Sequence, residues 1–380
     1  MENAYAGREQ TRAKHQILKN YLKPFAMKIF RFSDSLDFID GFSGPWENRD
    51  LENFSDTSIG ISLSTLSDVA EALGHTPAAP KIRCIFNEEN KASFAKLQAY
   101  LGEARAKYPL VKIEAFSGAF EHNASAIRRA ADHDFTLLFV DPTGHTGFPA
   151  NALGLFAGPK SEIILNFMRS FMTRFVVGNH PDRAQRLEEL LGVSRAARVL
   201  SMPRTIEVLE AEYLAMLKAD LGYRFASFSP IHDANRNEIK FHLAYATRHP
   251  KGIEVMRTAE RAALNAYDKD RLQRSFNKGQ QASLFTDAVI DEMADYGPYL
   301  RLCRQHLESA PEIILDILSG SPGVNYQMLC GRVQERLYMI RREVGDVVVD
   351  LASKKMIEPT WLLRGGRRPG DDDRMVVTRP

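Results

Sequence analysis

Cysteine is scarce in this chain. Only Cys84, Cys303 and Cys330 occur among its 380 residues, and no two of them lie close in the sequence. This spacing excludes a four-cysteine zinc site and an iron–sulfur cluster held within the chain, because both need thiolates grouped in short motifs. Few cysteines are typical of proteins in a reducing compartment, so we expect a cytoplasmic protein.

Long apolar segments are lacking as well. The longest apolar stretches, such as residues 135–140, have the length of a strand. A membrane helix needs roughly 20 apolar residues, and the N-terminal sequence MENAYAGREQTRAKHQ has no apolar signal core. These absences predict that the protein does not associate with a membrane.

An excess of charge of one sign is also missing, since 50 Lys and Arg face 48 Asp and Glu for a net charge of +2. Any surface that binds nucleic acid must therefore be local. The histidines have no metal-ligand spacing, so we expect no metal site. A composition of 44% hydrophobic and 26% charged residues is that of a globular protein, and the length suggests two domains or three small ones.

Strand and helix patterns alternate through the first half of the chain. After a helix at 11–30, apolar segments predict strands at 37–40, 81–86, 111–116, 135–140 and 162–167, with helices at 58–73, 91–101, 123–131 and 150–156 between them. Continuously apolar strands indicate a parallel sheet covered by helices on both faces. A helix at 204–221 then precedes two strands, 223–231 and 239–247, whose short polar connection predicts a β-hairpin. Five parallel strands followed by a hairpin is the element order of a class I S-adenosylmethionine (SAM) methyltransferase, a Rossmann-like α/β fold.

The C-terminal part has a different pattern. We expect the Rossmann-like domain to span residues 1–270, a linker or helical connection to span 271–308, and a second domain to span 309–380. Helices predicted at 311–318, 326–337 and 343–357 precede two short strands, 361–363 and 375–377, on either side of a polar loop. Three helices and a terminal hairpin predict a winged-helix-like α+β module.

The first candidate cofactor-binding segment is Asp40-Gly41-Phe42-Ser43-Gly44, which follows the first strand. Glycines at the carboxyl end of a strand let the backbone approach a ligand, and cofactors bind at this edge of open α/β sheets. The segment lacks the GxGxxG pattern and an immediate helix N-terminus, so a pyrophosphate would lose the helix dipole. A cationic adenosyl sulfonium would favour the carboxylate of Asp40. The alternative is a tight turn that binds no ligand.

The ends of the next two strands supply further candidates for the same site. Glu88 is placed to accept hydrogen bonds from both ribose hydroxyls of a nucleoside cofactor; Glu89 is its rival, and either acid could instead begin the next helix. At the third strand, Gly118 and Phe120 would support the adenine. Ala119 stands where a methyltransferase often has an aspartate, and a plain turn between strand and helix is the alternative.

Asp141 and Pro142 follow the fourth strand and are the candidate catalytic residues. They resemble the (D/N)PP(Y/F) loop of amino-group methyltransferases, in which the carboxylate and a proline carbonyl hold the target amine. The second proline and the aromatic residue are missing here, and Phe148 or His145 would have to replace the aromatic stack. The absence of a cysteine disfavours a covalent thiolate mechanism. An aspartate that merely caps a turn is the alternative.

The chain resembles the three-Cys-motif partner proteins over most of residues 11–260. The resemblance rests on Lys14, Leu18 and Tyr21 in the first helix, on residues 38–45, on residues 139–144, on residues 163–167 with Asn166, and on residues 243–249. Pro45-Trp46 and Thr143 depart from the family pattern. The resemblance implies a methyltransferase-like fold and a companion protein with a three-cysteine motif of the radical-SAM kind.

Three functions follow from these patterns. The first is a SAM-dependent methyltransferase that acts on a nucleic acid, DNA or RNA. The second is a non-catalytic adaptor that positions the substrate of the three-Cys-motif protein. The third is a DNA-binding regulator that uses the winged helix, in which Arg364, Arg367 and Arg368 would contact phosphates. In the alternative, these arginines are solvated or paired with residues 371–373.

Overall fold

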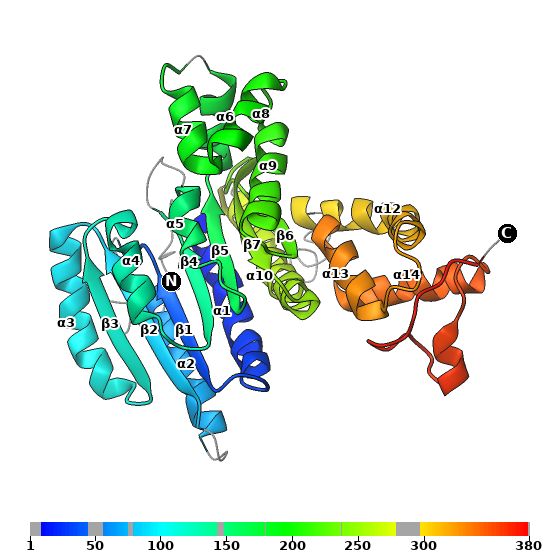
Figure 1. The fold of residues 1–380 in the computed structure, drawn as a ribbon, viewed down its shortest axis with the longest axis horizontal. Helices are drawn as coiled ribbons and strands as arrows, with labels where there is room; N and C mark the ends of the chain where they lie inside the picture. The colour runs from blue at the N-terminus through cyan, green and yellow to red at the C-terminus, as the bar shows by residue number, and fades with distance from the viewer. Residues whose placement is uncertain are drawn as a thin grey trace. The chain divides into compact units, whose positions relative to one another are not determined.

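The computed structural model describes residues 9–44, 56–74, 79–142, 148–178, 180–236, 238–278 and 297–378. Its contacts divide the chain into two compact units, Met1–Arg248 and His249–Pro380 (Figure 1). Part of the connection predicted at 271–308, namely residues 279–296, lies outside the described residues. Residues 298–308 belong to a helix, Pro298–Ser319.

The first unit is built on a mixed seven-stranded sheet, which confirms the predicted α/β class. The strand order is β3-β2-β1-β4-β5-β7-β6. Strands β1 to β5 are parallel, and β7 is antiparallel to both β5 and β6, so the last two strands form the predicted hairpin. The bounds are β1 Ser35–Asp40, β2 Lys81–Glu88, β3 Val111–Ser117, β4 Phe135–Val140, β5 Ser161–Phe167, β6 Phe225–His232 and β7 Ile239–Thr247.

Helices cover the sheet and bury its apolar side chains. Helix α1 packs beside α2, and α2 lies against β1, β2 and β3. A large core on the other side joins the strands to α4, α5, α7, α8 and α9. The bounds are α1 Glu9–Ile29, α2 Ser58–Leu73, α3 Lys91–Lys107, α4 Phe120–Ala130, α5 Ala150–Gly154, α6 Arg169–Val177, α7 Arg183–Leu191, α8 Val193–Ser201 and α9 Ile206–Ala215.

Helices α6, α7 and α8 form an insertion between β5 and α9 that the sequence patterns did not predict (Figure 1). The sequence of α7 does contain a helical pattern, because Leu187, Leu190 and Leu191 recur at helical spacing. The structure buries all three. The single helix predicted at 204–221 is α9 followed by a π-helical turn, Met216–Asp220. Helix α1 continues through Pro24.

A buried polar cluster fixes α1 to the sheet. Glu162 of β5 accepts hydrogen bonds from the hydroxyl groups of Tyr21, Tyr245 and Thr247, and the last two are 2.8 and 2.7 Å long. Burial raises the pKa of Glu162, and the three hydroxyl donors oppose that shift. All the polar atoms of its carboxylate are thus satisfied inside the core, which stabilises the docked helix.

The second unit contains α10 Pro250–Lys278, α12 Pro298–Ser319, α13 Tyr326–Arg336 and α14 Arg341–Ser353. The strand predicted at 361–363 is absent, because Thr360–Arg364 is a 3₁₀ helix with Trp361 buried. Within the described residues of this unit, the β-pairing consists of two isolated antiparallel bridges, Asn325 with Arg374 and Ile357 with Val377. In the parts of the chain that the structure describes, no helix is long and apolar enough to cross a membrane.

Candidate functional site

A cavity of about 690 Å³ opens at the carboxyl ends of β1, β2 and β4. This volume is in the range of small-molecule sites. Three residues predicted from the sequence line it, namely Gly44, Glu88 and Pro142, together with the alternatives Glu89 and Phe148. The fold thus brings the ends of three separate strands to one hollow. Phe42, Asn90, Lys91, Ala92 and Glu121 complete its lining.

Glu88 and Gly44 fit together at this cavity. A methyl group added to Gly44 would lie 2.0 Å from Oε2 and 2.9 Å from Cδ of Glu88, so the carboxylate occupies space that only glycine leaves open. Oε1 of Glu88 accepts the backbone N–H of Asn90 at 2.7 Å. Burial raises the pKa of Glu88, and the Asn90 N–H opposes this by favouring the anion. One carboxylate is therefore fixed at the cavity wall.

Asn87 connects the turns that follow three strands, a role the sequence analysis missed. Its Nδ2 donates to the carbonyl oxygens of Gly41 and Gly118, at 3.3 and 3.0 Å. Its Oδ1 accepts from Nδ2 of Asn123 at 2.8 Å, and its carbonyl accepts the Ser43 N–H at 2.8 Å. Gly118 has a φ of +118°, a conformation that favours glycine. The sequence did contain a signal for this role, because Asn87 is a side-chain amide at the end of a predicted strand, one residue before the candidate acid Glu88.

Asp40 lies beneath the first turn and does not line the cavity. It is fully buried, and its carboxylate accepts the Phe42 N–H at 3.1 Å and the Ser58 hydroxyl at 2.6 Å. Burial raises its pKa to about 7, although these hydrogen bonds oppose the shift. In the free protein Asp40 therefore holds the Gly41–Gly44 turn, and a contact between its carboxylate and a cofactor stays a prediction.

Phe120 forms the floor of this region. It is 1% exposed and packs against Phe42, Phe148 and Phe156, with ring centroids 6.0, 5.2 and 5.6 Å apart. A methyl group on Gly41 would lie 3.1 Å from the Phe120 ring. Phe42 and Phe148 line the cavity, whereas Phe120 supports them from below. Direct stacking of Phe120 on an adenine stays a prediction.

Asp141 is bound by two side chains from distant parts of the chain. The ammonium group of Lys14 lies 2.5 and 2.6 Å from its two oxygens, and Nδ2 of Asn166 donates to Oδ1 at 2.9 Å. Lys14 also lies over the Phe241 ring, 4.9 Å from its centroid. Oδ1 of Asn166 is buried and has no hydrogen-bond partner in the described structure. Thr143, Gly144 and His145 lie outside the described residues.

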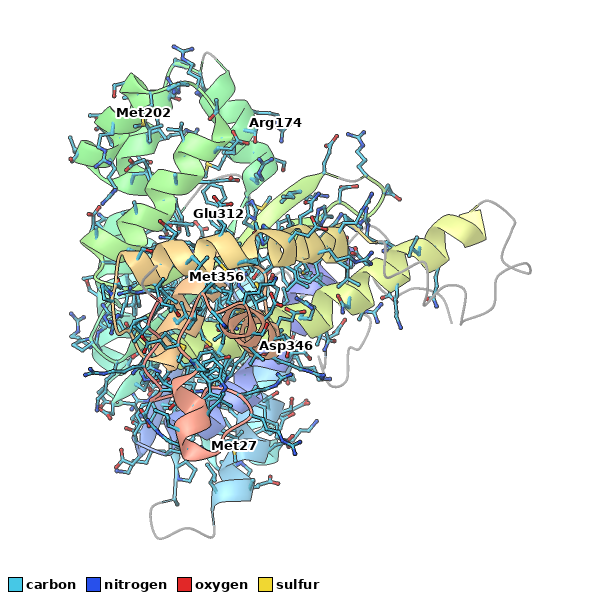
Figure 2. The ribbon with its side chains drawn as sticks, turned by 90° about the vertical axis from the view of Figure 1, so that its right-hand side faces the viewer. Met27, Arg174, Met202, Glu312, Asp346 and Met356 are labelled. Carbon is cyan, nitrogen blue, oxygen red and sulfur yellow. The ribbon has the colours of Figure 1, made fainter. Side chains whose placement is uncertain are left out.

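The arginines of the predicted wing have acidic neighbours within the second unit. Arg364 lies 3.1 Å from Asp373, and Arg368 pairs with Asp346 of α14. Arg367 is exposed. Asp346 is labelled in Figure 2. The pairing reduces the positive charge that Arg364 and Arg368 present, and their contact with a nucleic acid stays a prediction.

No family model matches the sequence, and no curated protein matches it. Among the described residues, no group of three or more His, Cys, Asp or Glu side chains could hold a metal ion.

Proposed function

We propose that the first unit binds SAM in the cavity and transfers the methyl group to an amino group. The observation that carries this proposal is the carboxylate of Glu88, which is fixed against Gly44 at the carboxyl end of β2. The strand order, with an antiparallel β7 inserted between β5 and β6, is the order of class I SAM methyltransferases and supports the proposal. The likeness of fold alone does not assign a reaction.

The charge of the cavity favours this cofactor over a dinucleotide. Glu88, Glu89 and Glu121 line the cavity and Lys91 is the one basic residue of its lining, so the described wall carries an excess of negative charge. Such a wall repels phosphate groups and attracts a cation such as a sulfonium. Glu88 would accept hydrogen bonds from the ribose hydroxyls, and the turn after β1 would hold the methionine part. Bound there, SAM would supply an electrophilic methyl group.

The surroundings of Asp141 suit an amine acceptor. The Asp141 carboxylate and Oδ1 of Asn166 are neighbouring oxygen acceptors at the ends of β4 and β5, and the amide oxygen lacks a donor within the described structure. A primary amine has two N–H groups that match these two oxygens. Lys14 supplies a counter-charge and fixes the orientation of the Asp141 carboxylate. Asp141 could then accept hydrogen bonds from the amine and orient its lone pair.

Calorimetric titration of SAM and of S-adenosylhomocysteine tests the cofactor assignment. We expect both to bind, and Glu88→Gln to weaken binding by about 1.5–3 kcal/mol, the range for a hydrogen bond to a charged group. Glu89→Gln is the matched comparison, because it removes the same charge from the neighbouring position of the wall but no group assigned to the ribose, so its loss of affinity should be smaller. Absence of binding to the unaltered protein, or equal losses in both variants, would contradict the proposal.

A specific observation favours a second candidate, the non-catalytic adaptor. Lys14 and Asn166 already donate hydrogen bonds to the carboxylate of Asp141, which suits a structural role for Asp141. Asp141→Asn decides between the two functions: a methyltransferase should lose transfer to amine acceptors while SAM affinity stays within a few-fold. An adaptor should show no transfer in either form and should co-purify with a three-Cys-motif protein encoded nearby, the partner that the resemblance implies.

The second unit supports a nucleic-acid substrate in this proposal. Its helices and bridges follow the order α12, Asn325, α13, α14, Ile357 and Val377, which matches the order of helices and strands in a winged helix. In that arrangement α14 would enter a groove and residues 364–374 would form the wing. Replacing Arg367 by alanine should weaken nucleic-acid binding equally across sequences. It should also reduce the slope of log affinity against log salt by about 0.9, the value for one phosphate contact on duplex DNA. The absence of a gel shift at low salt with the unaltered protein would refute a nucleic-acid substrate.

A further inference from the structure

A histidine side chain lies beside the candidate acceptor site and takes no part in the proposed function. His15 follows Lys14 in helix α1, and the ammonium group of Lys14 contacts the carboxylate of Asp141. The ring of His15 is also held by the segment that leads into α2, because its Nδ1 lies 2.7 Å from the backbone carbonyl oxygen of Asp56. The imidazole is thus fixed between α1 and the start of α2.

These attachments place His15 at the carboxyl edge of the sheet, between the ends of β1 and β4. Asp56 precedes Ser58 by two residues, and the Ser58 hydroxyl donates to Asp40, the last residue of β1, at 2.6 Å. Strands β1 and β4 are parallel neighbours, and Asp141 directly follows β4. The turn assigned to the cofactor follows one of these strands, and the residue assigned to the amine follows the other. His15 therefore lies beside the region in which an acceptor amine would stand.

The hydrogen bond to Asp56 fixes the tautomer of His15. A carbonyl oxygen only accepts, so Nδ1 carries the proton and Nε2 of the neutral ring carries the lone pair. Nε2 has no hydrogen-bond partner among the described residues. Burial lowers the pKa of His15 below 6.5; the charge of Asp141 opposes this shift, that of Lys14 adds to it, and the carbonyl and the charge of Asp56 oppose it. At pH 7 the ring is thus neutral, with its Nε2 lone pair available.

The neighbouring carboxylates are less suited to take up a proton from an amine. Both oxygens of Asp141 lie at hydrogen-bond distance from the ammonium group of Lys14. Asp40 is fully buried beneath the first turn, and Glu88 is assigned to the ribose. The lone pair of His15 is not engaged in this way, which makes it the better proton acceptor.

We propose that His15 is the general base of the methyl transfer, a role that rests on the proposed function. An amino nitrogen becomes positively charged when it is methylated, and it returns to neutrality by losing a proton. The N–H bond breaks, its electron pair stays on the nitrogen as a lone pair, and the proton bonds to Nε2 of His15. The imidazolium then releases the proton to water, because His15 is only partly buried. Asp141 and Asn166 orient the amine, and His15 takes its proton.

Proton–nitrogen NMR of the imidazole rings tests the state of His15 in the full chain without cofactor. We expect the resonances that His15→Asn removes to report a proton on Nδ1 and to titrate below pH 6.5. A neutral ring with its proton on Nε2, or an imidazolium at pH 7, would overturn the proposal. This measurement needs neither SAM nor an acceptor, so its outcome is separate from that of the proposed function.

Methyl-transfer kinetics test the base itself. In His15→Asn the amide Nδ2 takes the place of Nδ1 as donor to Asp56, but no group there takes up a proton. The kcat should fall about 100–10,000-fold, the range for general base catalysis, while SAM affinity in calorimetry stays within a few-fold. His180→Asn is the matched control and should leave kcat unchanged, because His180 is exposed in the insertion and has no assigned role.

Free imidazole separates the loss of a base from the loss of structure. In His15→Ala, imidazole in solution should restore part of the rate, whereas a folded variant that it does not rescue would make His15 structural. If the variants do not fold, NMR of the unaltered protein, with His15 assigned through its backbone, decides. Full activity of His15→Asn beside an active unaltered protein would overturn the role of His15 alone. Absence of transfer by the unaltered protein would overturn the proposed function and this role together.

Discussion

Replacing Asp40 by asparagine should change how the stability of the first unit depends on pH. Burial raises the pKa of this carboxyl from 3.8 to about 7. Between these values the folded state holds one proton more than the unfolded state, so the free energy of unfolding falls as pH rises from about 4 to about 7. A shift of about three units, at 1.36 kcal/mol per unit, makes this loss about 4 kcal/mol.

Asparagine resembles the protonated carboxyl and keeps its hydrogen bonds. Its Oδ1 can accept the Phe42 N–H, and its Nδ2 can donate to the Ser58 hydroxyl. The stability of Asp40→Asn relative to the unaltered protein should therefore rise by about 4 kcal/mol between pH 4 and pH 8. Urea unfolding monitored by circular dichroism at several pH values measures this difference.

A surface aspartate provides the control for this experiment. The pKa of Asp134 is lowered, first by its hydrogen bond with Lys160 and then by that with Ser33, and its side chain is 39% exposed. A lowered pKa contributes stability that is fully present above the unfolded value of 3.8 and is lost as pH falls through the folded value. The stability of Asp134→Asn relative to the unaltered protein should therefore stay constant between pH 4 and pH 8 and rise only at lower pH. A difference for Asp40→Asn that does not vary with pH, or that falls as pH rises, would refute the reasoning about burial.

Three substitutions test other contacts. Gly44→Ala meets only the far end of Glu88, so it should weaken SAM binding at least about tenfold in calorimetry and cost less than about 1 kcal/mol of stability; unchanged affinity would contradict this. Gly41→Ala meets the buried ring of Phe120 and should destabilise by about 1–3 kcal/mol in urea unfolding, whereas a neutral result would show that the ring can move. Arg195→Met removes the buried guanidinium that joins Glu212 to Asp220 and leaves Glu212 paired with Arg198 alone, so it should cost about 1–3 kcal/mol by the same assay, and a stable variant would argue against the pairing.

Strand positions were predictable because burial on both faces leaves a clear pattern. The apolar run Phe135–Val140 and the segment Ile239–Thr247 have the predicted bounds. Gly44 and Glu88 could be placed at one edge of the sheet because parallel strands end on the same side. The second strand extends to Glu88 rather than ending at Phe86, since its polar last residues still pair with β3.

Contacts between distant segments could not be predicted in this way. Lys14 and Asp141 are separated by 127 residues, and local periodicity carries no information about which charges meet. The strand predicted at 361–363 failed because Trp361 and its apolar neighbours fit a strand pattern, whereas only Trp361 is buried and Leu363 is 90% exposed. A short apolar run does not by itself distinguish a strand from a helical turn.

The docking of α1 through the Glu162 cluster has a consequence for synthesis of the chain. Tyr21 is made 224 residues before Tyr245, with which it shares the cluster. At a translation rate of about 5–20 residues per second, the helix waits roughly 10–45 s for the strand that completes its binding site. During this interval the sheet against which Ile17, Leu18 and Leu22 are fully buried in the finished fold is incomplete. Complete docking of the nascent helix therefore waits until β7 has been synthesised.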